Sequence, residues 1–334
     1  METIREFTMK TEELVLSPVA CRSSQSRGRL VPMEEDDLRT PFQRDRDRIL
    51  HCNAFRRLQH KTQVFLSPTG DHYRTRLTHT LEVSQIARTM ARGLRINEDL
   101  TEAIALGHDL GHTPFGHAGE RALDAVMEDG FRHYEQSLRV VDKIERGGRG
   151  LNLTWEVRNG ILCHTRGPEA ETLEGRIVKH ADRIAYINHD IDDAIRAGLF
   201  REEELPSHLR EILGKSKGER IDTLVRSTLE NTGSGPEIRM DESVRTAFDE
   251  LTTYMFKNVY TNPVCKGEEG KAVDMLQTMF HYFVDDPERL PEEYWPVVTA
   301  ESPERAACDY ISGMSDRYAL TVYQDLFIPR PWAE

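Results

Sequence analysis

Residues 107–120 hold an unusual concentration of side chains that bind metals or carry protons. The stretch GHDLGHTPFGHAGE contains three histidines and two carboxylates, together with four glycines and one proline. Relative to alanine, glycine disfavours a helix interior by about 1 kcal/mol and proline by about 3 kcal/mol. A plain core helix would therefore not have this composition. Because imidazoles and carboxylates are common metal ligands and proton carriers, the stretch predicts a chemical role.

The first half of the stretch predicts a pair of ligands at a helix end. Asn97 is a good helix N-cap, and the pattern after it predicts a helix that runs to Gly107. Neighbouring helical side chains point about 100° apart, so His108 and Asp109 can grip one ion only near a helix end or distortion. Gly107, Gly111 and Pro114 supply such a break.

The second half predicts a new helix that starts at about residue 116 and runs to about 127. His117 and Glu120 would lie one turn apart on one face of it. A surface ion pair is the alternative interpretation of these two residues.

Two more candidates occur on other predicted helices. His79 lies near the start of an amphipathic helix, where a lone histidine is usually structural. Asp182 lies on a long helix predicted for residues 173–197, and Tyr186 and Asp190 follow at intervals of four to form one polar stripe. Such a stripe can also be a solvated surface.

Together these candidates predict a metal centre. Two imidazoles and two carboxylates from three helices give a mixed nitrogen and oxygen set: His79, His108, Asp109 and Asp182. This set suits Mn²⁺, Mg²⁺, Fe²⁺, Co²⁺ or Ni²⁺ with water completing the shell, rather than a closed structural zinc site. A divalent ion of this kind polarises a phosphoryl oxygen and acidifies bound water.

A basic segment precedes His79. Residues 39–76 contain nine Lys or Arg residues and three acidic ones, although the whole chain of 334 residues has a formal charge of −13. Arg57, Lys61 and Arg76 are candidates for phosphate binding, whereas residues 44–48 also suit an exposed helix with Arg–Asp pairs.

Composition excludes several classes of protein. The acidic balance argues against a general polyanion or membrane-surface binder. The five cysteines are scattered without a CxxC pair, as is typical of reduced thiols in a cytosolic protein, at positions Cys21, Cys52, Cys163, Cys265 and Cys308. No apolar run resembles a signal peptide or a membrane span. We expect a cytoplasmic protein.

The helical pattern extends over most of the chain and predicts a mostly α fold with few or no short strands. Residues 1–36 are expected to form a flexible arm, residues 37–200 the catalytic core and residues 201–334 a C-terminal helical region packed on that core. The last helix is predicted for residues 305–323.

The order H…HD…D on helices resembles that of the HD-domain metal phosphohydrolases. Further sequence blocks resemble those of the deoxyguanosine triphosphate triphosphohydrolase (dGTPase) family. This resemblance covers about residues 39–325. These blocks are residues 55–58 (FRRL), 61–65 (KTQVF), 108–120, 131–139 (FRHYEQSLR), 150–154 (GLNLT), 181–190 (ADRIAYINHD) and 312–318 (SGMSDRY).

This resemblance implies a reaction and its residues. A dNTP would be cleaved at its α-phosphorus to a deoxynucleoside and tripolyphosphate. His117, oriented by Glu120, would move a proton, and His112 and His133 would stabilise or protonate the phosphate side.

The resemblance also implies substrate contacts. Arg57, Arg76 and Lys61 would neutralise the triphosphate. Tyr186 and Asp190 would meet the sugar, and Gln59 resembles the contact to the 3′-hydroxyl.

Relatives form homo-oligomers, often hexamers, so a homo-oligomer is expected. The preferred base and any activating dNTP stay open. Two alternatives also stay open: an HD phosphohydrolase that acts on another nucleotide phosphoester, and a nucleotide-sensing or single-stranded-nucleic-acid-binding protein. The acidic balance does not favour nucleic acid as a partner.

Overall fold

The computed structural model describes residues 2–63, 74–260 and 267–330. These residues form helices and connecting loops without a strand, which confirms the predicted mostly α fold. The β-type pairs within this part are isolated bridges, Arg29–Thr154 and Thr62–Thr75. Cys265 and the last two residues of the 61–65 block lie outside the described residues.

The chain folds into two compact units that interleave along the sequence. Unit 1 comprises residues 1–52, 78–108 and 151–262, and unit 2 comprises residues 53–77, 109–150 and 263–334. Helix α4 (Arg76–Leu94) starts with two residues of unit 2 and continues in unit 1. The three consecutive segments expected from the sequence do not follow this division, and their boundaries stay a prediction.

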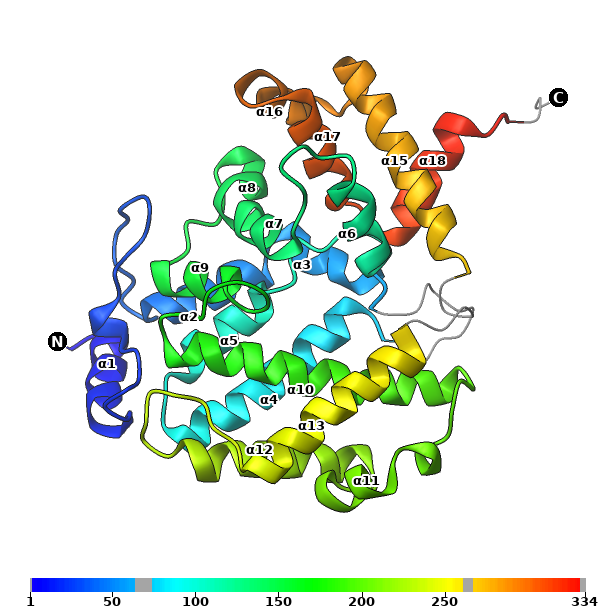
Figure 1. Cartoon of the computed structure of the whole chain (residues 1–334). Helices are drawn as coiled ribbons and strands as arrows, with labels where there is room; N and C mark the ends of the chain where they lie inside the picture. The colour runs from blue at the N-terminus through cyan, green and yellow to red at the C-terminus, as the bar shows by residue number, and fades with distance from the viewer. Residues whose placement is uncertain (1, 64–73, 261–266, 331–334) are drawn as a thin grey trace. The chain divides into compact units, whose positions relative to one another are not determined.

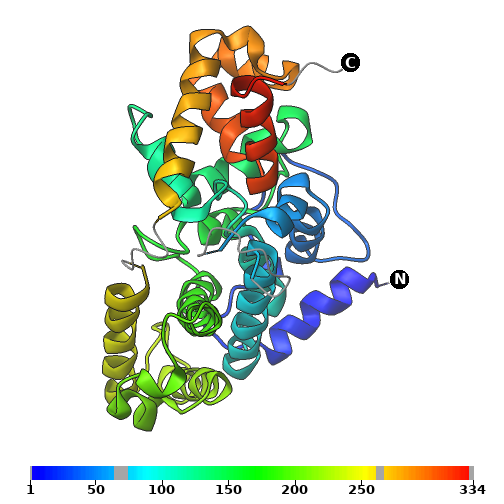
Figure 2. The ribbon, with the colours of Figure 1, turned by 90° about the vertical axis from the view of Figure 1, so that its right-hand side faces the viewer.

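Unit 1 is organised around the long helix α10 (Leu173–Arg196), which the sequence predicted to within one residue. Figures 1 and 2 show it beside its neighbours, and Figure 2 views it along its axis. Ile177, Ala181 and Ile184 are fully buried at helical spacing and form its apolar side. The other helices are α1 (Ile4–Val15), α2 (Pro41–Leu50), α5 (Glu98–Gly107), α9 (Trp155–Leu162), α11 (Ser207–Leu213), α12 (Lys217–Thr232), α13 (Glu242–Met255) and the π-helical turn η5 (Phe256–Tyr260).

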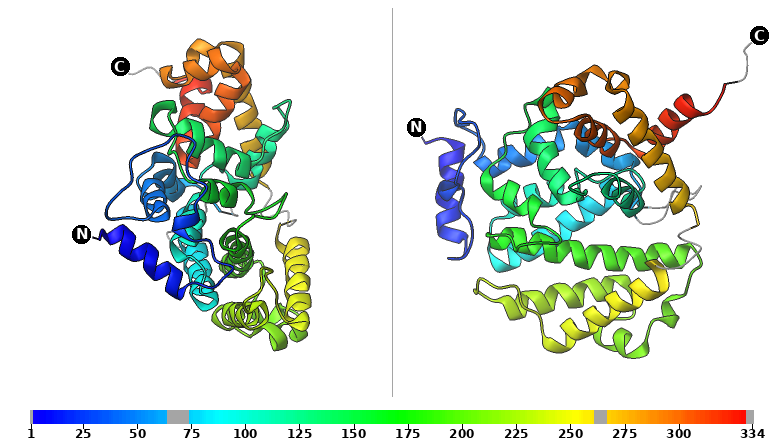
Figure 3. Two further views of the ribbon diagram at one scale, coloured as in Figure 1. Left: turned by 90° about the vertical axis from the view of Figure 1, so that its left-hand side faces the viewer. Right: turned by 45° about the horizontal axis from the view of Figure 1, so that its top comes forward.

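The N-terminal segment is held against unit 1 by hydrogen bonds, although its composition predicted a loose arm. Thr3 caps α1, which lies at the edge of the unit (Figure 3). The buried Glu12 carboxylate accepts hydrogen bonds from Ser23 and from the Asn97 side chain. Glu156 accepts from the backbone N–H of Arg27. These polar contacts could not be predicted from the hydrophobic pattern of the segment, which is weak.

Unit 2 packs α15 (Glu269–Asp285) against α6 (Gly116–Asp124) and α17 (Pro303–Ser312). Leu276, Leu123 and Ile311 lie in its buried core. Its other helical elements are α3 (Asn53–Arg57), η2 (Leu58–His60), α7 (His133–Arg139), η3 (Val140–Ile144), α8 (Glu145–Gly148), η6 (Pro287–Arg289), η7 (Glu292–Tyr294), α16 (Trp295–Ala300) and α18 (Asp316–Phe327).

The prediction of one helix over residues 305–323 was wrong. The chain forms α17 and α18 instead, because Gly313 ends the first helix and Ser315 caps the second by accepting the N–H of Tyr318. Serine is a favoured N-cap, since its hydroxyl satisfies a backbone N–H that has no partner within the helix.

Candidate active site

Three side chains of the predicted metal set meet inside unit 1. His79 lies on α4, His108 directly follows α5, and Asp182 lies on α10. Asp182 Oδ1 is 3.0 Å from Nε2 of His79 and 3.9 Å from Nε2 of His108. Both imidazoles are buried. Two nitrogens and one oxygen therefore converge from three helices.

Local contacts orient His108 for coordination. Its Nδ1 lies 2.6 Å from the backbone oxygen of Ala105. A carbonyl only accepts, so Nδ1 carries the proton and Nε2 presents its lone pair toward Asp182. A Cβ at Gly107 would lie 2.6 Å from Cδ1 of Ile161, so this glycine lets α5 approach α9 closely.

Two further histidines border this cluster, and the sequence reasoning did not assign them a role. The ring centroid of His164 is 4.9 Å from that of His108, and the ring centroid of His189 is 6.0 Å from that of His79. Burial lowers the pKa of His189 to about 4, so this ring is neutral at neutral pH. Its position seven residues after Asp182, on the same face of α10, was the available signal.

Asp109 belongs to unit 2, because the division falls at the peptide bond between His108 and Asp109. Within unit 2, Nη1 of Arg76 donates to Asp109 Oδ2 at 2.7 Å, and both side chains are buried. Atoms of Asp109, His112 and His133 that could bind a metal lie within 4.8 Å of one another. The carboxylate of the HD pair is thus surrounded by a guanidinium and two imidazoles.

The three side chains that converge in unit 1 fit a divalent cation. The His79, His108 and Asp182 cluster offers imidazole nitrogen and carboxylate oxygen, a donor set that suits Mn²⁺, Fe²⁺, Co²⁺, Ni²⁺ and Mg²⁺. The tautomer of His108 leaves Nε2 for coordination. These three side chains thus form a cluster within unit 1 that could hold a metal.

A second cluster in unit 2 joins three of the predicted catalytic residues. Glu120 Oε2 is 3.2 Å from Nδ1 of His117, and Glu120 Oε1 is 2.9 Å from Nδ1 of His133. Burial alone would raise the pKa of Glu120, but the hydrogen bonds from both rings hold it well below its ordinary value. Glu120 is therefore ionised and orients both imidazoles, while the His117 side chain stays 69% exposed.

The fourth predicted catalytic residue, His112, stacks on His133. Their ring centroids are 4.3 Å apart with an interplanar angle of 18°, and His117 lies 5.5 Å from His112. Burial, followed by the charge of Arg76, holds the pKa of His112 well below its ordinary value. His112 is consequently a neutral imidazole at neutral pH.

Close backbone approaches build the turn that carries these residues. A Cβ at Gly111 would lie 2.1 Å from the backbone nitrogen of Ser137, and one at Gly119 would lie 2.0 Å from the oxygen of Pro114. Phe115 adopts a left-handed conformation with φ 61° and ψ 26° directly before α6. Such tight packing explains the glycines that the sequence places here.

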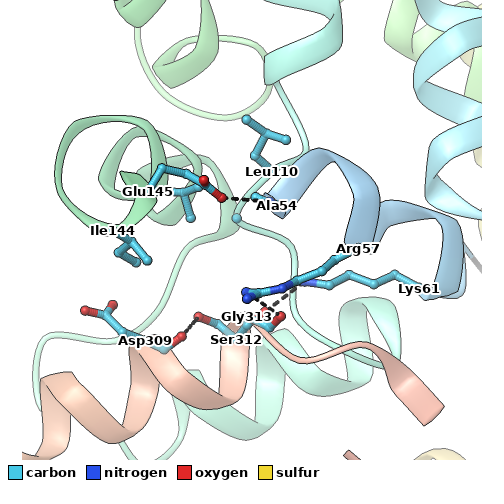
Figure 4. Close-up of a pocket in the computed structure, with 11 residues that line it drawn as sticks. Ala54, Arg57, Lys61, Leu110, Ile144, Glu145, Asp309, Ser312 and Gly313 are labelled. Carbon is cyan, nitrogen blue, oxygen red and sulfur yellow. Dashed lines mark hydrogen bonds between the residues drawn. The ribbon is translucent and has the colours of Figure 1, made fainter. Parts of the chain in front are cut away.

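Two of the predicted triphosphate-binding residues, Lys61 and Arg57, contact backbone oxygens within unit 2. Lys61 is fully buried, and its ammonium donates to the backbone oxygens of His112 and Ser312. Burial lowers the pKa of Lys61 to about 7. Arg57 donates to the oxygen of Gly313, and Figure 4 shows both cations beside the end of α17. They line a cavity of about 20 Å³, which has room for one water molecule.

Gln59 lies exposed on η2. The polar stripe predicted on α10 is present in unit 1, where Asp190 is buried and accepts a hydrogen bond from the hydroxyl of Tyr260. Burial, followed by the charge of Asp182, raises the pKa of Tyr186 to about 12, so its hydroxyl stays neutral. Tyr260 could not be identified from the sequence, because its contact with α10 arises only from the tertiary fold.

Comparison with known proteins defines the class. The HD domain family matches residues 76–187, and the phosphohydrolase-associated domain matches residues 238–325. The protein is therefore an HD-domain phosphohydrolase.

Curated relatives narrow the family. A deoxyguanosinetriphosphate triphosphohydrolase-like protein of Caldanaerobacter subterraneus is 55% identical over 99% of this chain and 98% of its own. Proteins of the same name from Desulfatibacillum aliphaticivorans and Clostridium tetani are 49% and 46% identical, each over 98% of this chain and over 99% and 97% of their own. The chain belongs to the deoxyguanosinetriphosphate triphosphohydrolase-like family, as its resemblance predicted.

A crystal structure of a hypothetical protein from Aquifex aeolicus matches 86% of this chain and 68% of that chain, with a TM-score of 0.46 and 19% identity. Across the described residues, every helix is too short or too polar to cross a membrane.

Proposed function

We propose that this protein is a metal-dependent dNTP triphosphohydrolase, which cleaves a dNTP at its α-phosphorus to a deoxynucleoside and tripolyphosphate. The observation that carries the proposal is the presence of two clusters of side chains suited to this chemistry, one in each unit. The His79, His108 and Asp182 cluster suits a cation, and Glu120 orients His117 and His133 in the segment that follows Asp109. The names of the curated relatives support the substrate class.

In this proposal His79, His108 and Asp182 would hold the divalent ion, and Asp109 would join them as the residue bonded to His108. When bound, the ion supplies Lewis acidity toward a phosphate oxygen and acidifies water. The donor set does not select among Mn²⁺, Mg²⁺, Fe²⁺, Co²⁺ and Ni²⁺.

His117 would exchange a proton with the reacting oxygens through Nε2, since its Nδ1 is directed at Glu120. The ionised Glu120 would stabilise the imidazolium that forms when His117 gains a proton. His133 shares this carboxylate, and the neutral His112 stacks on it, so these rings would offer hydrogen bonds to the phosphate side.

Arg76 is the best placed of the proposed triphosphate ligands, because its guanidinium already lies beside Asp109. Arg57 and Lys61 would act with it, although backbone oxygens engage both side chains. For the sugar we propose Tyr186 and Asp190, with Gln59 as a contact to the 3′-hydroxyl.

Product analysis tests the reaction. The purified protein is incubated with Mn²⁺ or Mg²⁺ and with each dNTP, singly and in mixtures. We expect a deoxynucleoside and tripolyphosphate in equal amounts. Monophosphate with pyrophosphate would contradict cleavage at the α-phosphorus, and hydrolysis only of another nucleotide phosphoester would favour that alternative. The mixtures also reveal base preference and any activation by a second dNTP.

The metal set has a separate test that does not depend on turnover. Elemental analysis should find a divalent metal in the parent protein and lose it in Asp182→Ala and His79→Ala. We also propose a homo-oligomer, which light scattering of the purified protein would test.

A further inference from the structure

Three segments that are far apart in the sequence meet at the start of α6 in unit 2. They are residues 61–62, residues 112–116 and residues 312–316. The buried Lys61 ammonium donates to the oxygens of His112 and Ser312, the latter at 2.8 Å. Figure 4 shows Lys61 reaching the end of α17, where Ser312 lies. One cation thus bridges the other two segments.

Asp316 forms a second bridge with both carboxylate oxygens. Its Oδ1 accepts the backbone N–H of Phe115 at 2.9 Å. Its Oδ2 accepts the backbone N–H of Thr62 at 2.9 Å and also the Thr62 hydroxyl. The residue is 8% exposed at the first position of α18. Because the acceptor is a buried carboxylate, these three hydrogen bonds connect Thr62 and Phe115 strongly to the start of α18.

The turn that Asp316 holds is one that the local sequence does not favour. Phe115 is left-handed with φ 61°, a conformation that non-glycine residues rarely adopt. Gly116 is also left-handed, and α6 has no side-chain cap at Phe115. The Phe115 ring is buried in the core of unit 2 together with Met314 and Ala319. Tertiary contacts, rather than capping within α6, must therefore stabilise this conformation.

The geometry of this turn bears directly on His117. That residue is the second of α6, and its ring is exposed and tied through Nδ1 to Glu120 on the same helix. Because the ring is exposed, its position depends on the hydrogen bond to Glu120 and on the backbone conformation at the start of α6. The segment that Asp316 holds at Thr62 is also connected to Arg76. Thr62 pairs with Thr75, and the backbone N–H of Arg76 donates to the backbone oxygen of Lys61 at 3.0 Å.

We propose that Asp316 is a positioning residue, which holds Phe115 and Thr62 so that His117 enters the active site at the start of α6. The effect of Asp316 on turnover rests on the proposed function of His117. The stabilisation of the turn at residues 112–116 by Asp316 does not depend on that function. Asp316 lies in the region that matches the phosphohydrolase-associated domain. That region thereby contributes a carboxylate that shapes the turn after the HD pair.

The test compares Asp316→Ala and Asp316→Asn with Asp325→Ala. Asp325 lies on the same helix, is exposed and pairs only with Arg330 among the described residues. Asparagine keeps an acceptor for Phe115 but presents N–H groups to the Thr62 donors, so its effect should be intermediate. Thr62→Val, which removes one donor and keeps the backbone N–H, is a milder variant should Asp316→Ala fail to fold.

Two readouts are measured on each folded variant. Hydrogen–deuterium exchange of peptides that cover residues 112–118 should accelerate at least about tenfold in Asp316→Ala, while exchange in α15 stays unchanged. In the product assay, kcat should fall about tenfold or more while KM changes less than about twofold and metal content is retained. Asp325→Ala should match the parent in every measurement.

Faster exchange with an unchanged kcat would overturn the positioning role, because the turn would then not govern His117. A lower kcat without faster exchange would overturn the hold on the turn. If the parent protein does not release tripolyphosphate, the proposed function fails. Hydrogen–deuterium exchange alone then tests whether Asp316 stabilises residues 112–118. Retained protection in Asp316→Ala would in that case refute it.

Discussion

At the residue scale, the Glu120 carboxylate sets which ring nitrogen of His117 and of His133 carries the proton. Glu120 is ionised because two imidazoles donate to it, and it fixes the proton on Nδ1 of both His117 and His133. The Nε2 atom of the exposed His117 is therefore directed away from Glu120. Of the two rings, His117 is the exposed one, with 69% of its side chain accessible compared with 11% for His133. His117 is consequently the better proton carrier.

His117→Ala should slow turnover by about 10²–10⁴-fold, the usual contribution of a positioned general acid or base. The fold should be unaffected, because the ring is exposed and packs against no apolar core. Steady-state kinetics with the preferred dNTP, elemental analysis and thermal unfolding measure the three properties.

His208 is a matched control, because it is also an exposed histidine paired with a glutamate. Its Nε2 on α11 lies 2.8 Å from a carboxylate oxygen of Glu250 on α13. His208→Ala removes a similar ion pair and should leave kcat unchanged. Near-normal turnover in His117→Ala would remove this histidine from the mechanism.

The sequence revealed residues whose chemistry is set by local spacing. His108 and Asp109 are adjacent, and His117 and Glu120 are one turn apart, so their cooperation could be predicted without a fold. Asp316 and Tyr260 could not be assigned in this way, because their partners are 201 and 70 residues away. Lys61 looked like a phosphate ligand because charge is visible in a sequence, whereas its burial against backbone oxygens is not.

At the element scale, the glycines of the 107–120 turn allow helices and backbone to approach closely. One such approach involves Gly111, where a Cβ would overlap the backbone of Gln136 and Ser137 in α7. Backbone atoms in a helix cannot move aside as a flexible side chain can. Hydrophobic periodicity predicted the helices around this turn, but periodicity does not report how closely two backbones pass.

Gly111→Ala should therefore destabilise the protein by about 3 kcal/mol or more, at the upper end of overpacking effects. Gly218 on α12 is the matched control, since a Cβ there would meet nothing within 4 Å. Gly218→Ala should be neutral or stabilising by up to about 1 kcal/mol. Urea unfolding of both variants measures the difference, and equal stabilities would show that the turn relaxes easily.

At the scale of the whole molecule, buried carboxylates link stability to pH. Glu174 on α10 is fully buried and accepts the backbone N–H groups of Cys21 and Asn97, while Glu12 on α1 accepts from the side chain of the same asparagine. Burial raises the pKa of Glu174 to about 7, and the nearby Glu12 adds to this. Glu174 thus joins the N-terminal segment to α10, and its charge is repelled by that of the nearby Glu12.

Glu174 takes up its proton more readily in the folded chain than in the unfolded chain, where its pKa is near 4.5. Its contribution to stability is therefore fully present below about pH 4.5 and is lost as the pH rises to about 7. The pKa difference corresponds to about 3 kcal/mol. Glu174→Gln keeps an acceptor for both N–H groups and cannot ionise, so it should not show this loss.

We expect the stability of Glu174→Gln, measured relative to the parent by urea unfolding, to increase between about pH 5 and pH 7 and to level off above that. Other carboxylates also titrate as the protein is acidified, and the difference between variant and parent cancels their effect. Glu171→Gln is the control, because Glu171 lies three residues away, is exposed and pairs with Arg27 at the surface. A difference between Glu174→Gln and parent that does not vary with pH would mean that Glu174 is ionised throughout. In that case an anion would hold the N-terminal segment throughout this pH range, and its attachment would not respond to acidity there.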